Sequence, residues 1–386
     1  MITKIYMIRH AEAEGNLYRR VHGQYDSLNT ELGMRQIHAL SERFSALPVD
    51  AVYSSDLVRA VTTAQAISVP RELDILTTPK LREVGMGRWE DLTWAHLEQH
   101  EAQQLQFFNQ DPVRWNIGDN EPHQALGHRM VEAVMDITKH AAGQTVCVVS
   151  HGHAIRTLLA HILELPSERY GELPHLDNTA VTLLEVHDGQ DLTVRWMNDA
   201  SHLEGGLSTL ARQSWWRSEG AETGNADFLP LDIDQNERRY LSYRQEAWGE
   251  VHGTLAGFTD EYLDLARAHV HAHPLALVEG VISGTPFGLL ELNPQKGAAE
   301  KSGHISFYYV APGFREQGVG IQLLGHAISV YRPLGRENIT VHVAETNTAA
   351  IRFYERFGFQ KIGETEGVRC PLWVMALDIR VRVREL

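Results

Sequence analysis

Apolar positions follow two alternating rhythms along the first half of the chain. Short β-branched runs, typical of buried strands, are separated by longer stretches in which apolar side chains recur every three or four positions. Leu32, Ile37 and Leu40 share one face of such a stretch, and Thr30 before it is a preferred helix cap. The predicted strands are residues 2–8, 51–55 and 145–149, and the predicted helices are residues 31–47, 59–67, 130–140 and 154–165. This order predicts a doubly wound, mostly parallel α/β sheet, with its ligand site beyond the carboxyl ends of the strands.

The pattern changes further along the chain. Residues 180–186 and 192–197 predict a hairpin that ends the first unit, and periodicity then fades after Leu203. Two tryptophans in this stretch, Trp215 and Trp216, are expected to pin a connector to a neighbouring domain. The second half is expected to contain helices over 237–248 and 260–269, strands over 275–282, 287–292 and 304–310, a helix ending at 331 and a strand over 339–344. Strands bunched before a helix indicate an antiparallel α+β unit. The predicted division is a domain over 1–204, a connector over 205–226 and a domain over 227–386.

Length, charge and cysteine content narrow the function classes. The 386 residues are enough for two or three compact units, and a net charge of -15 argues against nucleic-acid binding, which normally needs a basic face. No apolar run is long enough to span a bilayer, and the first residues lack a signal cleavage site. Cys147 and Cys370 provide no disulfide framework. We expect a cytoplasmic protein with small-molecule partners and no membrane or nucleic-acid partner, while the oligomeric state stays open.

Two histidines stand at the carboxyl ends of predicted strands, where a doubly wound fold places its chemistry. His10 follows Arg9 at the end of the first strand, and His151 follows the strand over 145–149. Arg59 comes after a third strand, and Glu83 lies in a later loop. Two arginines that converge with histidines form a cradle for a dianion such as phosphate. Their charges are also expected to lower the pKa of His10, which keeps its imidazole neutral and nucleophilic.

In order along the chain, these residues resemble the motifs of the histidine phosphatase superfamily, also called the phosphoglycerate mutase-like family. The matching motifs are Arg9-His10-Ala11-Glu12, Asn16, a substrate-loop stretch over 23–33, Arg59, Leu81-Arg82-Glu83, Ser150-His151-Gly152 and Asn178 to Val181. The resemblance covers roughly the first half and implies that His10 attacks phosphorus to form a phosphohistidine. The developing charge would be held by the phosphate-binding residues Arg9, Asn16, Arg59 and His151. Glu83 would protonate the leaving oxygen and then activate water, without a metal.

Two residues depart from the pattern of this family. Ala11 replaces the usual glycine beside the nucleophile, and His153 stands where a glycine is common. His151 and His153 are not accompanied by a cysteine or carboxylate cluster, so we expect no metal site and connect His153 with substrate choice. A phosphatase and a mutase use the same phosphohistidine and differ in how well water is excluded from it. The segment 94–122 is the only sizeable insertion that could serve as a lid, and on this basis we favour a phosphatase.

A second site is predicted where the strand over 304–310 runs into a glycine-rich loop before a helix. The glycines of the loop over 311–320 allow successive backbone N–H groups to face an anion at the helix N-terminus. This loop, with the strand over 339–344 and the stretch over 345–359 behind it, resembles the GNAT-type N-acetyltransferases. The resemblance extends over the predicted second domain and implies acetyl-CoA as the cofactor.

The resemblance to GNAT enzymes implies a role for several residues. Arg315, Gln317, Gly318, Val319 and Gly320 match the family's loop motif and would hold the pyrophosphate, and the strand end at Tyr309 and Val310 would pair with the pantetheine amides. Asn347 matches a cofactor-contacting asparagine, and Tyr354 matches the general acid for the departing thiolate. Glu291 and His304 are both candidates for the base, which an alkyl amine with a pKa near 10.4 would need. An amine of lower pKa would need less help.

The leading interpretation is a bifunctional enzyme, in which a metal-independent phosphomonoesterase is fused to an acetyl-CoA-dependent N-acetyltransferase acting on a small-molecule amine. One alternative is a phosphomutase with the same C-terminal domain. Another is a regulatory module in which one half binds CoA or a phosphorylated ligand without turnover. The sequence identifies neither substrate.

Overall fold

The computed structural model describes residues 1–188, 191–213 and 224–386 and divides the chain into two compact units. The first unit comprises Met1–Thr223 with Val381–Leu386, and the second comprises Gly224–Arg380. Trp215 and Trp216, which we expected to pin the connector, lie outside the described residues. Each unit is described by itself below.

The first unit is built on a six-stranded sheet in the order β3-β2-β4-β1-β5-β6. Its strands are β1 (Ile2–Arg9), β2 (Ala51–Ser54), β3 (Ile75–Thr77), β4 (Thr145–Ser150), β5 (Val181–His187) and β6 (Asp191–Asp199). The pairs β3/β2, β2/β4 and β4/β1 are parallel, and the predicted hairpin β5/β6 adds the antiparallel edge. The mostly parallel sheet is therefore confirmed. The three-residue strand β3 was not predicted.

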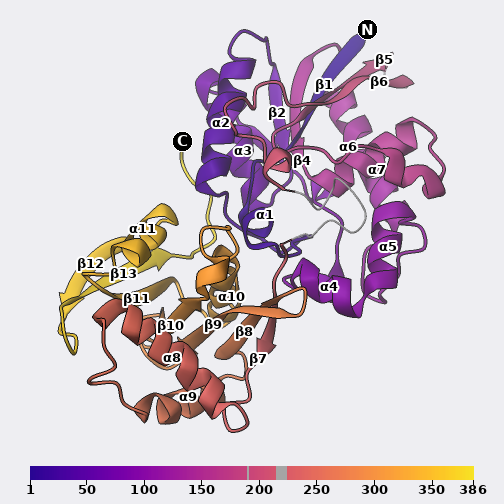
Figure 1. Ribbon diagram of the computed structural model, residues 1–386. Helices are drawn as coiled ribbons and strands as arrows, with labels where there is room; N and C mark the ends of the chain where they lie inside the picture. Colours follow the sequence, from indigo (N-terminus) through magenta and orange to yellow (C-terminus); the bar gives the residue numbers. More distant parts are fainter. Residues whose placement is uncertain (189–190, 214–223) are drawn as a thin grey trace. The chain divides into compact units, whose positions relative to one another are not determined.

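Helices cover both faces of this sheet because successive residues of the buried strands point to opposite sides (Figure 1). Val146 and Val148 of β4 pack in one apolar cluster with α6 (His123–His140) and α7 (Gly152–Ile162). Cys147 and Val149 pack in another with α2 (Glu31–Phe44) and α3 (Val58–Ser68). The hydroxyl of Thr30 accepts a hydrogen bond from the Gly33 N–H at 3.0 Å, so the predicted cap of α2 is present. Parallel strands between two helical layers place the carboxyl ends of β1, β2 and β4 at one edge.

The segment expected as a lid is part of the packed core. It forms α4 (Trp94–His100) and α5 (Ala102–Gln110), and the short α1 (Glu14–Tyr18) precedes it in the chain. Leu97, Phe108 and Trp115 are buried in the same cluster that contains α6 and α7. This burial argues against the lid expected for the segment, because opening these helices would expose aromatic side chains to water.

Residues 205–213, which we predicted as the beginning of a connector, belong to the first unit. The side-chain amide of Gln36 in α2 donates to the carbonyl of Leu207 at 2.8 Å and to the hydroxyl of Thr209 at 2.9 Å. The Thr209 hydroxyl in turn donates to the Glu12 carboxylate at 3.1 Å. The beginning of the predicted connector thus adds to the frame around the loop that follows His10.

The second unit is a seven-stranded sheet in the order β12-β13-β11-β10-β9-β8-β7 (Figure 1). Its strands are β7 (Asp227–Pro230), β8 (Leu277–Ile282), β9 (Thr285–Asn293), β10 (Ser302–Val310), β11 (Asn338–Ala344), β12 (Gln360–Thr365) and β13 (Leu372–Asp378). All neighbouring pairs are antiparallel except β10/β11. This confirms the α+β expectation, although β7, β12 and β13 were not predicted.

Helices also lie on both faces of the second sheet. Leu277 and Leu289 pack with α8 (Glu237–His252) and α9 (Glu261–Ala272) on one face. Gly288 faces the other side, where a side chain in its place would lie 3.2 Å from Leu323 of α10 (Ile321–Tyr331). The last helix is α11 (Thr348–Arg356). Among the helices of the described ranges, none combines the length and the apolar character that a membrane crossing requires.

Candidate active sites

The first candidate site is centred on His10, immediately after β1. The backbone N–H of His10 donates to the Ser150 carbonyl at 2.9 Å, which fixes the chain beside the end of β4. The Nδ1 atom of His10 lies 2.7 Å from the Ala11 carbonyl, and a contact with a carbonyl requires Nδ1 to carry the hydrogen. In the neutral ring the lone pair is then on Nε2. His10 is therefore oriented as a nucleophile through Nε2.

The pKa of His10 is held well below its ordinary value, first by burial and then by the charges of Arg59 and Arg9. Neutrality was expected, but burial is a larger cause than the arginines named in that prediction. Burial likewise lowers the pKa of His151, and the two rings have centroids 5.1 Å apart. Nε2 of His151 contacts the Ser55 hydroxyl at 2.9 Å. Its Nδ1 is buried and has no hydrogen-bond partner among the described residues.

Of the two predicted phosphate-binding arginines, Arg59 is buried and Arg9 is half-buried, and both contact the loops of the site. Arg9 donates to the Leu176 carbonyl through one terminal nitrogen, and its Nε has no partner among the residues described. Arg59 donates to the carbonyls of Tyr25 at 3.0 Å and Gly23 at 2.7 Å, so it also holds the predicted substrate loop. Burial lowers the pKa of Arg59 to about 10, and nearby carboxylates oppose this effect. Both guanidinium groups retain their charge at neutral pH.

The predicted acid Glu83 faces the N-terminus of α7. Its Oε1 accepts hydrogen bonds from the backbone N–H of Val84 at 3.0 Å and of Ala154 at 2.8 Å, and its Oε2 accepts one from His153 at 3.0 Å. Oε2 therefore has the greater remaining capacity for a proton. Asn16 lies in α1, where its Oδ1 accepts a hydrogen bond from the Ala13 N–H at 3.1 Å.

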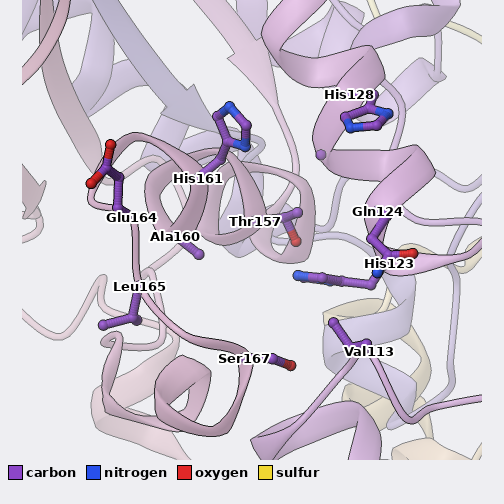
Figure 2. Close-up of a pocket in the computed structure, with 11 residues that line it drawn as sticks. Val113, His123, Gln124, His128, Thr157, Ala160, His161, Glu164, Leu165 and Ser167 are labelled. Atoms are coloured by element: carbon purple, nitrogen blue, oxygen red, sulfur yellow. The ribbon is translucent and has the colours of Figure 1, made fainter.

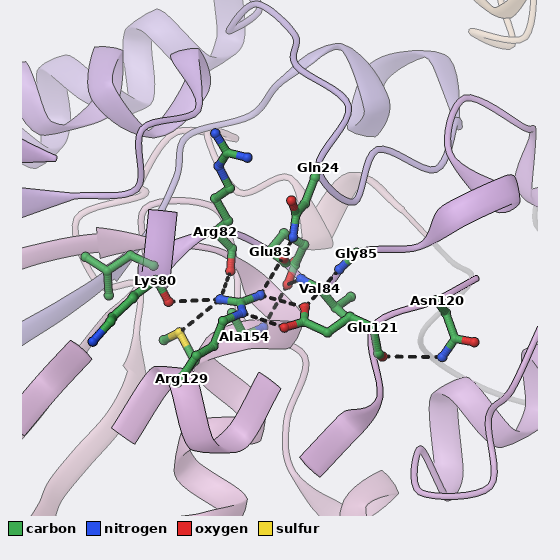
Figure 3. A network of polar contacts seen from close by, with 12 residues as sticks. Gln24, Lys80, Arg82, Glu83, Val84, Gly85, Asn120, Glu121, Arg129 and Ala154 are labelled. Atoms are coloured by element: carbon green, nitrogen blue, oxygen red, sulfur yellow. Dashed lines mark hydrogen bonds and ion pairs between the residues drawn. The ribbon is translucent and has the colours of Figure 1, made fainter. Parts of the chain in front are cut away.

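Arg129, which sequence reasoning did not identify, organises the backbone around Glu83 (Figure 3). Its guanidinium donates to the carbonyls of Arg82 at 2.7 Å and Glu83 at 2.8 Å, and it forms a two-point ion pair with Glu121 at 2.6 and 2.8 Å. The same Glu121 carboxylate accepts a hydrogen bond from the Gly85 N–H at 3.1 Å. Arg129 therefore positions the acid loop. The sequence feature that could have identified Arg129 is its charge at a position on the core-facing side of α6, which is otherwise apolar.

Three further residues hold the catalytic loop or the ring of His151, and the sequence did not assign this role to them. The Thr63 hydroxyl accepts a hydrogen bond from the Ala11 N–H at 2.9 Å, and the Asn178 side chain donates to the His10 carbonyl at 2.9 Å. Ser55 contacts His151 as described above. The sequence spacing could have placed two of them near the site: Thr63 lies one helical turn after Arg59, and Ser55 directly follows β2.

A cavity of about 340 Å³ opens between α6 and α7, apart from all of these residues (Figure 2). His123, His128 and His161 line it together with Thr157 and Glu164. None of the predicted catalytic or phosphate-binding residues is among its lining. The ring of His123, in the lining of this cavity, meets the ring of His153 edge-on at 6.0 Å between centroids.

The second candidate site lies where β10 and β11 separate. Their parallel register ends at Ile305, so Tyr309 and Val310 are paired with β9 alone among the described strands. The loop that follows is exposed from Arg315 to Gly318, and Gly318 has a φ of +77° with open space where a side chain would be. The Tyr308 hydroxyl donates to the Gly320 carbonyl at the start of α10. A splayed strand end and an exposed loop before a helix fit a CoA-type ligand, with a pyrophosphate on the N–H groups of the loop.

The side chains of the predicted loop motif have contacts of their own. Arg315 forms an ion pair with Glu250 of α8 at 2.9 Å and donates from Nε to the Val310 carbonyl at 2.8 Å. Gln317 donates to the Gly313 carbonyl at 2.6 Å, and Asn347 caps α11 by accepting a hydrogen bond from the Ala350 N–H at 3.1 Å. These side chains therefore stabilise the loop and helix termini, and the backbone of Gly318, Val319 and Gly320 is the part left to meet an anion.

Tyr354 and the two candidate bases differ in protonation. Burial raises the pKa of Tyr354, whose ring packs against Tyr308 and Phe359, so its hydroxyl keeps its proton. Burial alone would raise the pKa of Glu291, but hydrogen bonds from His269 and Tyr240 and the Arg244 charge give a lowered pKa overall. Burial lowers the pKa of His304 to about 3. Glu291 is thus held in ion pairs and His304 is a weak base, and neither suits an alkyl amine.

Comparison with known proteins assigns a family to each half of the chain. The model of the histidine phosphatase superfamily (branch 1) matches residues 5–199, and the model of the acetyltransferase (GNAT) family matches residues 215–359. A probable phosphoglycerate mutase GpmB of Yersinia pestis (strain Pestoides F) is 32% identical over 207 residues, which are 53% of this chain and 96% of that protein. The solved structure of Bacillus stearothermophilus YhfR is 32% identical, with a TM-score of 0.51, and the match covers 52% of this chain and all of the other. A mycobacterial glucosyl-3-phosphoglycerate phosphatase is 25% identical, with a TM-score of 0.47 over 52% of this chain and 100% of its own. The chain belongs to the histidine phosphatase superfamily, branch 1, through its first unit and carries a GNAT-family acetyltransferase domain in its second.

Proposed function

We propose that the first unit hydrolyses a small phosphomonoester through a phosphohistidine at His10, and that the second transfers an acetyl group from acetyl-CoA to a small-molecule amine. The phosphatase proposal rests on the contact of His10 Nδ1 with the Ala11 carbonyl. This contact leaves the lone pair of the neutral ring on Nε2, within a buried site that also contains arginine charges. The predicted domain bounds were 1–204 and 227–386, and the proposal assigns the two activities to the units Met1–Thr223 and Gly224–Arg380. The cytoplasmic location stays a prediction.

The phosphatase half works in two steps. His10 Nε2 forms a bond to phosphorus while the bond from phosphorus to the ester oxygen breaks, and Glu83 Oε2 gives its proton to that oxygen as the alcohol leaves. Water then attacks the phosphohistidine, Glu83 takes a proton from it, and the bond from Nε2 to phosphorus breaks as inorganic phosphate forms. Arg9, Arg59 and the unpartnered Nδ1 of His151 are the groups proposed to hold the phosphoryl oxygens, with Asn16 at the edge.

In the acetyltransferase half, acetyl-CoA supplies an activated acyl group when bound. Backbone N–H groups of Gly318, Val319 and Gly320 would hold its pyrophosphate, and the unpaired side of Tyr309 and Val310 would hold its pantetheine amides. Tyr354 keeps its hydroxyl proton, as a donor to a departing thiolate must. Because neither Glu291 nor His304 is suited to deprotonate an alkyl amine, an acceptor amine of lower pKa is favoured.

A phosphomutase is the second candidate, because the Yersinia pestis relative is named a probable phosphoglycerate mutase. The mutase would pass the phosphoryl group from His10 to a second alcohol instead of water. The two reactions are separated by whether inorganic phosphate or a phosphorylated isomer accumulates.

The first test is release of inorganic phosphate from a panel of phosphorylated metabolites in EDTA. We expect turnover by the native protein and none by His10→Ala, while His38→Ala, which changes an exposed histidine on α2, behaves as the native protein. Isomerised substrate without phosphate release would replace the phosphatase by the mutase. Amine-bearing members of the panel are then offered with acetyl-CoA, and binding of CoA without acetyl transfer to any of them would reduce the second unit to a binding module.

A further inference from the structure

The beginning of α7 is surrounded by more buried nitrogen atoms than one phosphoryl group is expected to satisfy. Among the described residues, Arg9 Nε, His151 Nδ1, His153 Nε2 and Arg156 Nε are all buried and have no hydrogen-bond partner. Buried polar groups are nearly always paired, so this concentration marks a place where a ligand supplies acceptors. The first two belong to the phosphoryl site above. The other two have no role in the proposed reaction.

Arg156 lies too far along α7 to duplicate His151. The step of five positions from His151 to Arg156 corresponds to roughly 7.5 Å along the helix axis. Arg156 is 5% exposed, and its Nη2 donates to the carbonyls of Tyr170 at 3.3 Å and Leu173 at 3.1 Å. It has no carboxylate partner in the described part of the chain, although Arg9 is near enough for the two charges to interact. The guanidinium carbon also lies 4.5 Å from the centroid of the Tyr170 ring, but a ring face does not neutralise the charge. A buried guanidinium without a carboxylate partner is costly, so its charge requires an explanation.

His153 completes the arrangement from the same face of α7. Its Nδ1 lies 3.2 Å from the Tyr170 hydroxyl, and when that hydroxyl donates to Nδ1 the ring hydrogen is on Nε2. Burial and then the Arg156 charge keep the pKa of His153 well below its ordinary value, so the ring is neutral. Phe108 stacks on it with a centroid distance of 4.5 Å and an interplanar angle of 13°. The ring is thus held between Tyr170 and Phe108, and in this tautomer it offers one N–H donor.

We propose that Arg156 and His153 form a second anion subsite, which binds a carboxylate carried by the phosphomonoester. Two N–H donors, from Arg156 Nε and His153 Nε2, match the two oxygens of a carboxylate, and the guanidinium supplies the charge. The spacing along α7 suits a substrate whose carboxylate lies a few bonds from its phosphoryl group. This inference rests on the proposed phosphatase function, and it explains a histidine at a position where the family commonly has glycine.

The test compares 3-phosphoglycerate with glycerol 3-phosphate, which has a hydroxymethyl group in place of the carboxylate. Binding of both is measured by calorimetry to His10→Ala, which cannot turn them over, and to His10→Ala combined with Arg156→Gln. We expect 3-phosphoglycerate to bind at least about tenfold more tightly in the first background, and Arg156→Gln to reduce this ratio to near one. Adding Arg156→Lys instead should restore part of the ratio, and His153→Phe should reduce it by a smaller factor.

Two outcomes would overturn the subsite. One is equal binding of the two compounds to His10→Ala, and the other is an Arg156→Gln loss that is the same for both, which would mean that Arg156 only supports the Tyr170 segment. Thermal unfolding of each variant identifies a general folding defect, and Arg169→Gln, an exposed arginine of that segment, is the matched control. Because binding is read without turnover, failure of the phosphatase reaction in the native protein is a separate result.

Discussion

The two units place their candidate sites on different kinds of structure. In the first unit the reacting groups are buried side chains, and His10 and His151 are fixed by several hydrogen bonds at the ends of parallel strands. In the second unit the predicted cofactor loop is exposed from Arg315 to Gly318, and the side chains of its motif are occupied in supporting the loop. The first site is thus built from side-chain chemistry and the second mainly from backbone geometry.

This difference determines which substitutions matter. A buried nucleophile with a fixed tautomer has no replacement among the other residues, so its loss removes the reaction. An anion held by backbone N–H groups tolerates changes of side chain and is sensitive only where the backbone conformation depends on the residue, as at a glycine with positive φ. We therefore expect effects of very different size in the two units.

The largest effect is expected for His10→Ala. Without Nε2 no bond to phosphorus can form, and phosphatase turnover should fall on the order of 10⁴-fold or more. The measurement is phosphate release, together with acid-labile phosphate on the protein after a rapid quench. Acetyl transfer by the same variant should stay at the native level, and a parallel loss of both activities would contradict the assignment of separate sites.

Glu83→Gln is expected to come next, with a loss of about 10²- to 10⁴-fold on an alkyl phosphate, because the leaving oxygen loses its proton donor. The loss should be much smaller for the first step with p-nitrophenyl phosphate, whose leaving group needs no proton. The backbone N–H bonds from His153 and Ala154 can still be accepted in part by the amide oxygen, so the fold should be retained. An equal loss on both substrates would argue that Glu83 only supports α7.

Which strands and helices could be predicted from the sequence depends on whether the element has a local pattern of its own. The strand β4 and the capped helix α2 were predictable because burial on two faces and a hydroxyl before an apolar stripe leave local signals. Parallel topology then brings His10 and His151 to one edge without further information. The three-residue strand β3 and the exposed strand β12 have no such pattern and are stabilised by pairing with distant segments.

Site electrostatics were less predictable than site membership. The sequence indicated that arginines would keep His10 neutral, but burial is the larger cause, and burial depends on the whole fold. Arg129 and the occupied carbonyl contacts of Arg59 likewise depend on loops that only the tertiary structure places together. The sequence therefore predicts which residue types meet at the site, because this depends on strand order. It does not predict the desolvation of those residues or the contacts that support them.

The pH dependence of stability should also separate the units. Burial lowers the pKa of His175 to about 3 and of His123 to about 4, and it also lowers the pKa values of His10, His151 and His153 in the first unit. Below the unfolded value near 6.5 the unfolded chain binds protons that the folded unit does not, so stability falls as pH falls from about 6.5 toward 4. The buried carboxyls Glu12 and Asp26, whose pKa values are raised by burial, act in the opposite direction but are fewer.

The second unit has fewer such groups, with His304 the most strongly affected, so its acid sensitivity should be smaller. Hydrogen exchange read by mass spectrometry assigns stability to each unit separately. Between pH 7 and pH 5 we expect the first unit to lose the larger share of its stability, corresponding to a fall in its unfolding temperature of about 10 °C or more. A larger loss in the second unit would show that histidine burial does not govern this response.

The smallest effect is expected for Gly318→Ala in the second unit. At a φ of +77° an alanine is strained, and the cost of about 1 kcal/mol corresponds to roughly fivefold weaker CoA binding if the loop must keep this conformation. No atom lies within 4 Å of the added methyl group, so a steric clash does not contribute. Gly313→Ala is the matched control, because Gly313 has equally open surroundings and is not among the glycines with positive φ.

Comparison of Gly318→Ala with Gly313→Ala tests whether the second site binds CoA through its backbone and not through side chains. If backbone conformation carries the binding, calorimetry with CoA should show a loss for Gly318→Ala alone, while removal of the Arg315 side chain, which is paired with Glu250, costs less than about threefold. If Arg315→Ala instead weakens CoA binding more than Gly318→Ala does, the guanidinium leaves Glu250 to meet the pyrophosphate. The second site would then depend on a side chain as the first one does.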